Sequence, residues 1–338
     1  MIKALKRKLE FKLFAIWQSK QGAAKILRPI SWLYCAIVIC RRLAYHLKLK
    51  KTEKVNVPVI MVGNLTVGGT GKTPLVTWLT NYLKDKGYQP GIISRGYGGK
   101  ARHWPQQVRP DGDPYAVGDE AILISKRTHS PMAVGPERLI SCQELLQYHP
   151  SCNVIISDDG LQHYALHRDI EVAVVDGKMR FGNGYCLPAG ALREPVKRLE
   201  KVDFIIANGE AQKDEYAMRY TLTHACSLLD STKTVPLEQF KRKEVHAVAG
   251  IGNPDRFFTQ LQEFGIKVIP HPFPDHHPFT EEELVFEDKK PILMTEKDAV
   301  KCKRYAQQDF WYVPVTVEVQ EIFGQKIIEK LKEIHTNG

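Results

Sequence analysis

The stretch from Val57 to Thr73, VPVIMVGNLTVGGTGKT, constrains this chain more than any other. It begins with a short apolar run rich in β-branched residues, which predicts a buried parallel strand. A glycine loop ending in Gly71-Lys72-Thr73 follows, and from Leu75 to Leu83 apolar residues recur at helical spacing. Strand, glycine loop and helix in this order predict a phosphate-binding loop, or P-loop.

The residue types suit a nucleotide, because glycines let backbone N–H groups approach phosphate oxygens and the helix directs its positive end at them. We expect Lys72 to reach the β- and γ-phosphates and the Thr73 hydroxyl to hold Mg²⁺. Only the GxGKT half of the pattern matches strictly, since Thr66 stands where the full pattern has glycine. The alternative is a glycine-rich turn before an ordinary helix. The predicted ATP-binding residues are Thr66, Val67, Gly68, Gly69, Thr70, Gly71, Lys72 and Thr73.

Two carboxylates, Asp158 and Asp159, follow a second apolar run that begins at Val154. An Asp at the end of a buried strand near a P-loop holds the Mg²⁺ that bridges the β- and γ-phosphates. A turn or helix cap is the plainer interpretation of one such Asp. Two together, about ninety residues after the P-loop, favour the metal role.

Strand and helix patterns alternate from Val57 onward, which predicts an α/β fold: a P-loop NTPase-like, mostly parallel sheet and a second, smaller α/β domain. A length of 338 residues suits two domains. We expect the P-loop domain over 55–220, an extended linker over 221–244, and over 245–338 a domain that closes over the site. Seven scattered Cys residues without a CxxC pair predict neither disulfides nor a zinc site and fit a reducing cytosol.

Basic charge is concentrated in residues 1–54, which carry fourteen Lys or Arg and two acidic residues, whereas the rest of the chain is nearly neutral. Leu5 to Trp17 reads as a basic amphipathic helix, and Ile30 to Cys40 is almost wholly apolar but too short to span a bilayer. Aromatic residues flank the apolar run. We expect these helices to lie on an anionic membrane surface; packing as a helix hairpin on the protein's own core is the alternative.

Seven motifs occur in this order: GNLTVGGTGKTP, SRGYGG, VGDE, DDGLQH, LPAGALREP, FPDHHPF and TEKDAVK. Together they resemble the tetraacyldisaccharide 4′-kinases, over most of the chain. The resemblance implies transfer of the ATP γ-phosphate to the 4′-hydroxyl of a tetraacyldisaccharide 1-phosphate lipid in lipid A biosynthesis. It also implies a peripheral or monotopic protein at the cytoplasmic face of the inner membrane. We expect a monomer with ATP and Mg²⁺ as cofactors.

The resemblance also assigns roles to residues outside the P-loop. Asp119 becomes the expected general base, oriented by His276, with His277 as the fallback assignment. Glu120 joins the expected metal ligands. The remaining expected site residues are two arginines for phosphate groups, Arg138 and Arg193, and the substrate contacts Tyr97, Gln162, His163 and Asp275. The resemblance gives no derivable chemical role to the segment from Thr295 to Asp298, for which helix capping is the plain alternative.

Two other classes of protein remain open from the residues alone. A membrane-associated partitioning ATPase would often carry a second lysine just before the paired glycines of the loop, where this chain has Val67. A nucleic-acid-binding protein could use the basic N-terminal segment. We expect no nucleic-acid partner, because the charge is confined to that segment.

Overall fold

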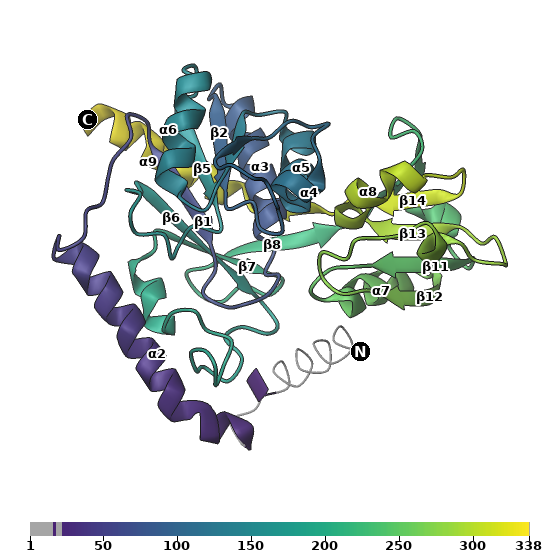
Figure 1. The fold of residues 1–338 in the computed structure, drawn as a ribbon, viewed down its shortest axis with the longest axis horizontal. Coiled ribbons are helices and arrows are strands. Elements are labelled where there is room, and N and C mark those ends of the chain that lie inside the picture. The colour runs from purple at the N-terminus through teal and green to yellow at the C-terminus, as the bar shows by residue number, and fades with distance from the viewer. Residues whose placement is uncertain (1–15, 18–21, 338) are drawn as a thin grey trace.

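The computed structural model describes residues 16–17 and 22–337, and it places them around two β-sheets (Figure 1). The first sheet has nine strands in the order β15-β8-β7-β6-β1-β5-β2-β4-β3. All its pairs are parallel except β3 with β4 and β15 with β8 at the two edges. Its strands are β1 (Val59–Gly63), β2 (Pro90–Ser94), β3 (Gln106–Gln107), β4 (Met132–Val134), β5 (Val154–Asp158), β6 (Ile170–Asp176), β7 (Phe204–Asn208), β8 (Tyr216–Thr221) and β15 (Thr316–Val319).

Helices cover both faces of this sheet, because its central strands are apolar on both sides. Ile60 and Val62 of β1 pack on one face with α3 (Lys72–Asp85), α5 (Asp119–Thr128) and α9 (Glu321–Asn337). Val59 and Met61 pack on the opposite face with α6 (Arg138–Tyr148). The short α4 (Pro114–Val117) and the 3₁₀ helix η1 (Val196–Lys201) complete the helices that surround the first sheet. This three-layer arrangement confirms the predicted mostly parallel α/β fold.

The second sheet has six strands in the order β10-β9-β14-β13-β11-β12, and its antiparallel pairs are the two that β9 forms with β10 and β14. Helices α7 and α8 lie on its opposite faces. Its elements are β9 (His224–Ser227), β10 (Thr234–Pro236), β11 (Glu244–Ala249), β12 (Lys267–Pro272), β13 (Ile292–Thr295), β14 (Phe310–Val313), α7 (Pro254–Glu263), α8 (Glu296–Cys302) and the 3₁₀ helices η2 (Leu237–Phe240), η3 (Glu282–Leu284) and η4 (Lys303–Tyr305).

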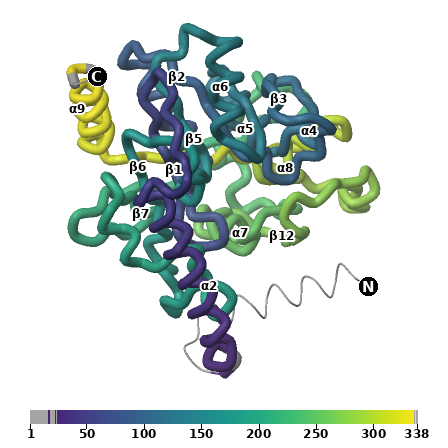
Figure 2. The backbone as a smooth tube through the Cα atoms, turned by 60° about the vertical axis from the view of Figure 1, so that its left-hand side comes forward, coloured from purple at the N-terminus to yellow at the C-terminus, as the bar shows by residue number. Residues whose placement is uncertain are grey.

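The expected boundaries around this second sheet differ from the observed ones. The expected linker over 221–244 contains β9, β10 and η2, which belong to the second sheet. Within the stretch 245–338, expected as one domain, the chain divides at Pro314 into β14 of the second sheet and β15 of the first. Proline lacks the N–H that a continuous ladder needs. The chain therefore ends on the first sheet, and α9 lies beside it in Figure 2.

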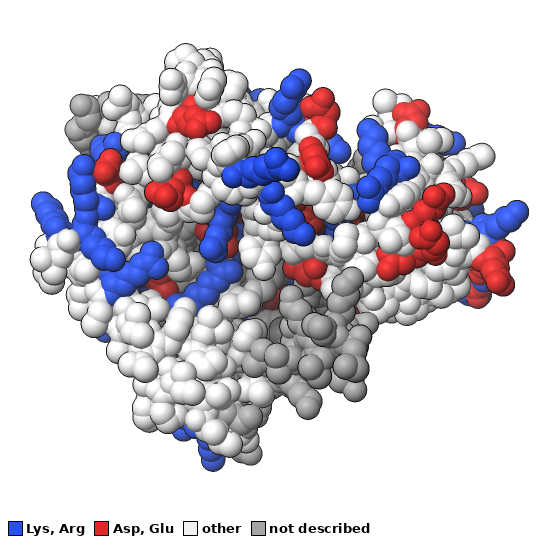
Figure 3. Space-filling view, in the orientation of Figure 1, with Lys and Arg blue, Asp and Glu red and all other residues white. Residues whose placement is uncertain are grey.

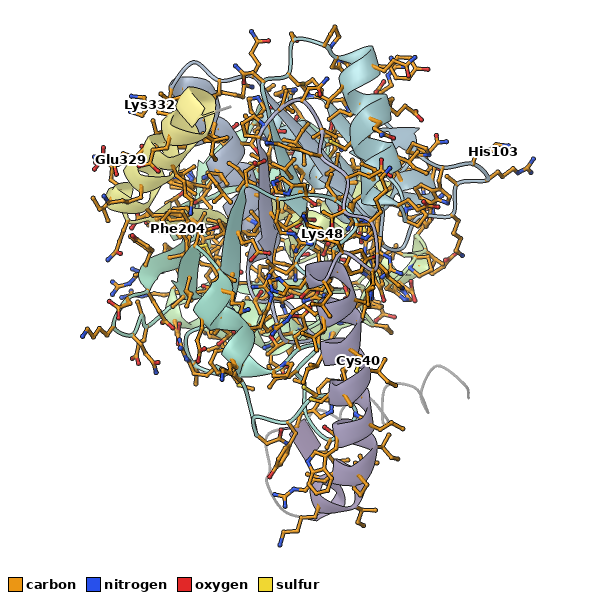
Figure 4. The ribbon with its side chains drawn as sticks, turned by 90° about the vertical axis from the view of Figure 1, so that its left-hand side faces the viewer. Cys40, Lys48, His103, Phe204, Glu329 and Lys332 are labelled. Carbon is orange, nitrogen blue, oxygen red and sulfur yellow. The ribbon has the colours of Figure 1, made fainter. Side chains whose placement is uncertain are left out.

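The N-terminal helix α2 (Ala23–His46) projects from the first domain, with Cys40 on the projecting part and Lys48 just past its end (Figure 4). It runs through Pro29, so the apolar run from Ile30 to Cys40 lies within one longer helix. The amphipathic helix expected from Leu5 to Trp17 lies outside the described residues, apart from 16–17. Within the described residues, no helix has both the length and the apolar character needed to cross a membrane.

One face of α2 is held against the loop that connects β6 to η1. Ser31 donates a hydrogen bond to the carbonyl of Cys186 (2.7 Å), and the Tyr34 hydroxyl donates to the carbonyl of Arg193 (3.2 Å). Beside this contact face, α2 exposes a row of apolar side chains at helical spacing, namely Ile26 (79 %), Ile30 (55 %), Leu33 (63 %) and Ile37 (60 %). Figure 3 shows few charged residues over this part of the surface.

Candidate active site

The candidate active site lies where the parallel strands of the first sheet reach their carboxyl ends, as is usual in open α/β sheets. Strand β1 pairs with β5 so that Val62 lies opposite Asp158. The P-loop that follows β1 and the carboxylates that end β5 therefore share one edge. Both were expected there from the sequence.

The P-loop has the backbone that its glycines permit. Gly68 and Gly71 have φ values of +115° and +102°, a region that favours glycine. A Cβ atom on Gly71 would lie 2.8 Å from both Asn208 Nδ2 and Tyr220 Oη. Helix α3 begins directly at Lys72, so its unpaired N–H groups face the loop. This geometry fits a triphosphate.

Two segments from elsewhere in the first domain contact the P-loop. The Val67 N–H donates to the carbonyl of Ala191 (2.8 Å), and Asn208 Nδ2 donates to the carbonyl of Thr70 (3.0 Å). Arg256 of α7 in turn donates to Asn208 Oδ1 (3.3 Å). Neither Asn208 nor Arg256 is expected from the sequence, because neither belongs to a motif and their contacts to the loop depend on the tertiary fold.

Asp158 and Asp159 have different surroundings. Asp158 is buried, and its Oδ1 atom has no hydrogen-bond partner among the described residues. Burial, and then the charges of Glu120 and Asp159, raise the pKa of Asp158 to about 7. Asp159 accepts two hydrogen bonds from Arg193 (3.0 and 3.1 Å) and lies 3.6 Å from Lys72 Nζ. Burial raises the pKa of Asp159, but these cations outweigh it and keep that pKa below its usual value.

These acidic residues suit Mg²⁺ in part. A buried carboxylate oxygen without a partner, on Asp158, is the kind of donor atom that a hard cation takes. Among residues 16–17 and 22–337, no three acidic, His or Cys side chains form a metal cage. Mg²⁺ in kinases needs none, since it commonly uses one or two carboxylates together with phosphate oxygens. Thr73, at the start of α3, stands on the same edge of the sheet.

The two expected arginines are placed differently. Arg193 lies at the surface of the site, where it contacts Asp159 and Gln162 Oε1 (3.4 Å). Arg138 is 2 % exposed and donates to the backbone carbonyls of Gly135 (2.9 Å), Asp158 (3.2 Å) and Asp159 (3.5 Å). Its burial lowers its pKa to about 10. Arg138 therefore supports the two carboxylates from behind, instead of presenting its guanidinium to a phosphate as expected.

Asp119 and His276 meet across the two domains. Asp119 is the first residue of α5 and is buried, whereas His276 lies in the loop after β12, with a φ of +56°. His276 Nδ1 is 2.9 Å from Asp119 Oδ1 and 3.1 Å from Oδ2. Burial raises the pKa of Asp119, but the bond from His276 and the charges of Lys297 and Lys301 outweigh it, and the pKa is lowered. The structure thus brings together the two residues expected to form the base.

The two neighbouring histidines, His276 and His277, have different contacts. His277 points elsewhere and bonds to Glu283 (2.9 Å), so it does not replace His276. The Tyr97 ring is 63 % exposed and lies 5.0 Å from the His276 ring between centroids. Tyr97 can therefore contact a molecule that reaches the Asp119–His276 pair.

Lys297 of α8 lies beside the Asp119–His276 pair. Lys297 Nζ lies 2.9 Å from Glu120 Oε1, 3.0 Å from Asp275 Oδ1 and 3.5 Å from His276 Nε2. Glu120, expected as a metal ligand, is thus held by a lysine. Thr295 accepts from the Asp298 N–H (3.2 Å) as the N-cap of α8, which matches the plain alternative for this segment. The four-residue spacing of Lys297 and Lys301 was the signal that sequence reasoning left unused.

Gln162 and His163 lie in the loop after β5. Gln162 Nε2 donates to the carbonyl of Asn64 (3.1 Å), so its side chain links this loop to the one after β1. Burial, and then the charges of Arg138, Arg168, Arg41 and Arg95, lower the pKa of His163 to about 4. His163 is therefore neutral at pH 7, in surroundings rich in positive charge.

Known proteins match this chain over most of its length. A family model described as LpxK, tetraacyldisaccharide-1-P 4'-kinase, matches residues 23–332. A tetraacyldisaccharide 4'-kinase of Nitrosococcus oceani is 52 % identical over 317 residues, which cover 94 % of this chain and 93 % of that protein. One of Methylobacillus flagellatus is 48 % identical over 319 residues, 94 % of this chain and 95 % of that protein.

A solved structure matches as well. The "apo" form of LpxK from Aquifex aeolicus, in complex with ATP, superposes with a TM-score of 0.77 at 30 % identity. The match covers 92 % of this chain and all of that one. The likeness confirms the expected fold class, and the relatives confirm the family resemblance that the motifs indicated.

Proposed function

Because this chain belongs to the tetraacyldisaccharide-1-P 4'-kinase family, we propose how its own residues carry out that family's reaction. The chain is an ATP-dependent lipid A 4'-kinase, as the motifs led us to expect. We also propose which residues bind Mg²⁺, which residue is the base, which residues contact the substrate and which surface meets the membrane.

The nucleotide is held by the P-loop. The backbone N–H groups from Gly68 to Thr73 receive the phosphates, and Lys72 neutralises charge on the β- and γ-phosphates. Asp158 and Thr73 are the proposed Mg²⁺ ligands, and the buried Asp158 oxygen without a partner supports this. Held by these two residues, a bound Mg²⁺ would offset the negative charge of the phosphates. Asp159, already paired with Lys72 and Arg193, keeps both cations in place at the γ-phosphate.

Asp119 is the proposed general base. In the reaction its carboxylate takes the proton of the 4′-hydroxyl as that oxygen bonds to the γ-phosphorus, and the bond from phosphorus to the ADP oxygen breaks. His276 donates its Nδ1–H to Asp119 and holds the carboxylate in one orientation. Because His276 belongs to the second domain, the base is complete only when the two domains are in contact. Closure would also exclude water, which otherwise competes as the nucleophile.

The sugar headgroup would lie between Tyr97, Gln162 and His163, beside Asp275 of the second domain. Arg193 is the proposed arginine for phosphate oxygens, since its guanidinium reaches the site edge and suits bidentate contacts. Arg138 keeps a supporting role through the backbone of Asp158 and Asp159.

The exposed apolar row of α2 is the proposed contact with a membrane. Apolar side chains on one helix face can enter the acyl boundary while Lys and Arg meet anionic headgroups. The substrate's acyl chains would stay in the bilayer, at the cytoplasmic face of the inner membrane, while the headgroup enters the site. The apolar surface favours lipid over nucleic acid as the partner. Because both members of the Asp119–His276 pair come from one chain, a monomer can act alone.

The observation that carries this mechanism is the 2.9 Å contact between His276 and Asp119. The test is transfer of labelled phosphate from [γ-³²P]ATP to a tetraacyldisaccharide 1-phosphate by purified protein in detergent. We expect lipid-dependent transfer, which Lys72→Ala abolishes while circular dichroism stays unchanged. ATP turnover that depends on dimerisation and ignores the lipid would instead favour a partitioning ATPase.

A further inference from the structure

Helix α8 carries much of the contact between the second domain and α5. Arg127 of α5 forms a two-pronged ion pair with Glu296, with one N–H···O distance of 2.9 Å. On the neighbouring turns, Lys297 and Lys301 both face the first turn of α5, because residues four apart lie on the same side of a helix. They approach Glu120 and Asp119, respectively.

The Lys301 ammonium is buried between two carboxylates. Its residue is 6 % exposed, and Nζ lies 2.8 Å from Asp298 Oδ1 and 3.6 Å from Asp119 Oδ2. The Phe279 ring lies beneath it, 5.1 Å from Nζ to the centroid. A buried ammonium is costly unless it is paired, so its position depends on both carboxylates.

Asp298 fixes Lys301 to the second sheet. Asp298 is fully buried, and its Oδ2 atom accepts from the Gly250 N–H (2.8 Å) and from the Thr295 hydroxyl (2.5 Å). Gly250 follows β11 and Thr295 ends β13, so the carboxylate is tied to two strand ends. Asp298 therefore holds the Lys301 ammonium at a fixed place beside the Asp119 carboxylate.

Lys297 faces the other member of the pair. Its ammonium can only donate hydrogen bonds, and it lies 3.5 Å from His276 Nε2. Asp275 Oδ2 lies 3.6 Å from the same nitrogen, so Nε2 faces a cation and a carboxylate together. Nδ1 faces the Asp119 carboxylate, which can only accept, and therefore donates its proton to it. Lys297, which also contacts Glu120 and Asp275, thus holds the Nε2 edge of the imidazole ring in place.

We propose that Lys301 and Lys297 are positioning residues for phosphoryl transfer, which orient the Asp119 carboxylate and the His276 imidazole when α8 meets α5. The proposal rests on the proposed role of Asp119 as the base. It gives the segment from Thr295 to Lys301 a function beyond capping a helix.

Joining α8 to α5 does not by itself explain why the Lys301 ammonium is buried beside Asp119. The Arg127–Glu296 pair already joins the two helices, and a buried ion pair adds little net stability compared with apolar packing. What Lys301 adds is a charge at a fixed place beside the reacting carboxylate. Misplacement of a reacting group by about 1 Å can cost about a hundredfold in rate.

The test compares Lys301→Met with Lys303→Met, an exposed lysine two residues further along. We expect Lys301→Met to lower kcat by about 10- to 100-fold with the KM for ATP changed by less than roughly twofold. Lys303→Met should retain the wild-type kcat. In an Asp119→Ala background, Lys301→Met should change the residual kcat by less than roughly twofold, because Lys301 acts through Asp119.

Three results would overturn the proposal: a wild-type kcat in Lys301→Met, a rise in KM alone, or the same loss with and without Asp119. If Lys301→Met does not fold, Lys297→Met provides the second measurement, compared in wild-type and His276→Ala backgrounds. Absence of lipid phosphorylation by the wild-type protein would refute the proposed function itself, which distinguishes the two failures.

Discussion

Asp119 is a buried carboxylate with a lowered pKa, which keeps it ionised and able to accept a proton at neutral pH. Asp119→Ala should lower kcat by about 10²- to 10⁴-fold, the usual contribution of a general base. The proposed ATP contacts are P-loop residues and not Asp119, so the dissociation constant of ATP should change by less than roughly threefold. Steady-state kinetics and a fluorescent ATP analogue measure both quantities. A rise in KM with an unchanged kcat would make Asp119 a binding residue.

Asp158 makes the stability of the folded protein fall as pH rises, whereas an acid paired with a cation makes it rise. Because its pKa rises to about 7 in the folded protein, it stabilises the fold fully below its unfolded pKa of about 4, and this stabilisation is lost as pH rises through 7. At pH 8 the free energy of unfolding of Asp158→Asn should therefore exceed that of the wild type by up to about 4 kcal/mol. The variant should accordingly unfold at a higher temperature.

The difference in free energy of unfolding between Asp158→Asn and the wild type should shrink as pH falls from 7 towards 4. Saturating Mg²⁺ and ATP should stabilise the wild type more than the variant at pH 8, if Asp158 is a metal ligand. Thermal unfolding across this pH range checks both statements. A difference between the proteins that is independent of pH would contradict the raised pKa.

For single residues, the sequence indicated which residues gather at the site more readily than it indicated what each side chain contacts. The loop from Gly68 to Thr73 was readable because its chemistry is local: glycine conformations, a strand before and a helix after. The supporting position of Arg138 was not, since only burial shows that its guanidinium faces backbone carbonyls. Lys301 was missed because its two partners lie in different domains.

Among the elements, α2 exposes an apolar face that a protein normally covers. Leu33→Glu with Ile37→Glu should weaken binding to vesicles that contain phosphatidylglycerol by at least about tenfold, because each change removes burial of a large apolar side chain. Co-sedimentation with vesicles measures the effect. Ile140→Glu, on the exposed side of α6, is the matched control and should bind like the wild type.

Equal binding by all three proteins would show that this face of α2 is not the membrane contact. Retained ATP binding in the α2 variant would show that the site itself remains intact. The fold around that site was largely predictable, because the apolar runs of β1 and β5 and the alternation of strand and helix patterns are visible in the sequence. The edge strands β3 and β10, of two and three residues, were too short to carry one.

On the scale of the whole molecule, the last helix belongs to the first domain. Phe323 of α9 is fully buried among the rings of Trp78, Phe204 and Tyr216, at centroid distances of 5.5 to 5.9 Å. Phe323→Ala should lower the free energy of unfolding by about 3–5 kcal/mol, whereas Ile322→Ala, at a half-exposed position, should stay within about 0.5 kcal/mol.

Urea denaturation of the two variants gives these free energies. Equal stability of Phe323→Ala and the wild type would contradict the packing of α9 on the first sheet. The sequence pattern gave no signal for this return of the chain, since an amphipathic helix fits either domain. Only the antiparallel pairing of β15 with β8 decides which domain it joins.

That pairing also has a topological consequence. Thr221 and Thr316 are directly opposite in the β8–β15 ladder, and their hydroxyls are 2.7 Å apart. The entire second domain therefore leaves and re-enters its host through a single pair of neighbouring residues. A tight hairpin turn could replace it by protein engineering, leaving a minimal nucleotide-binding body with its own C-terminus in place. Such a protein should bind ATP and transfer nothing, since it would lack the imidazole beside Asp119.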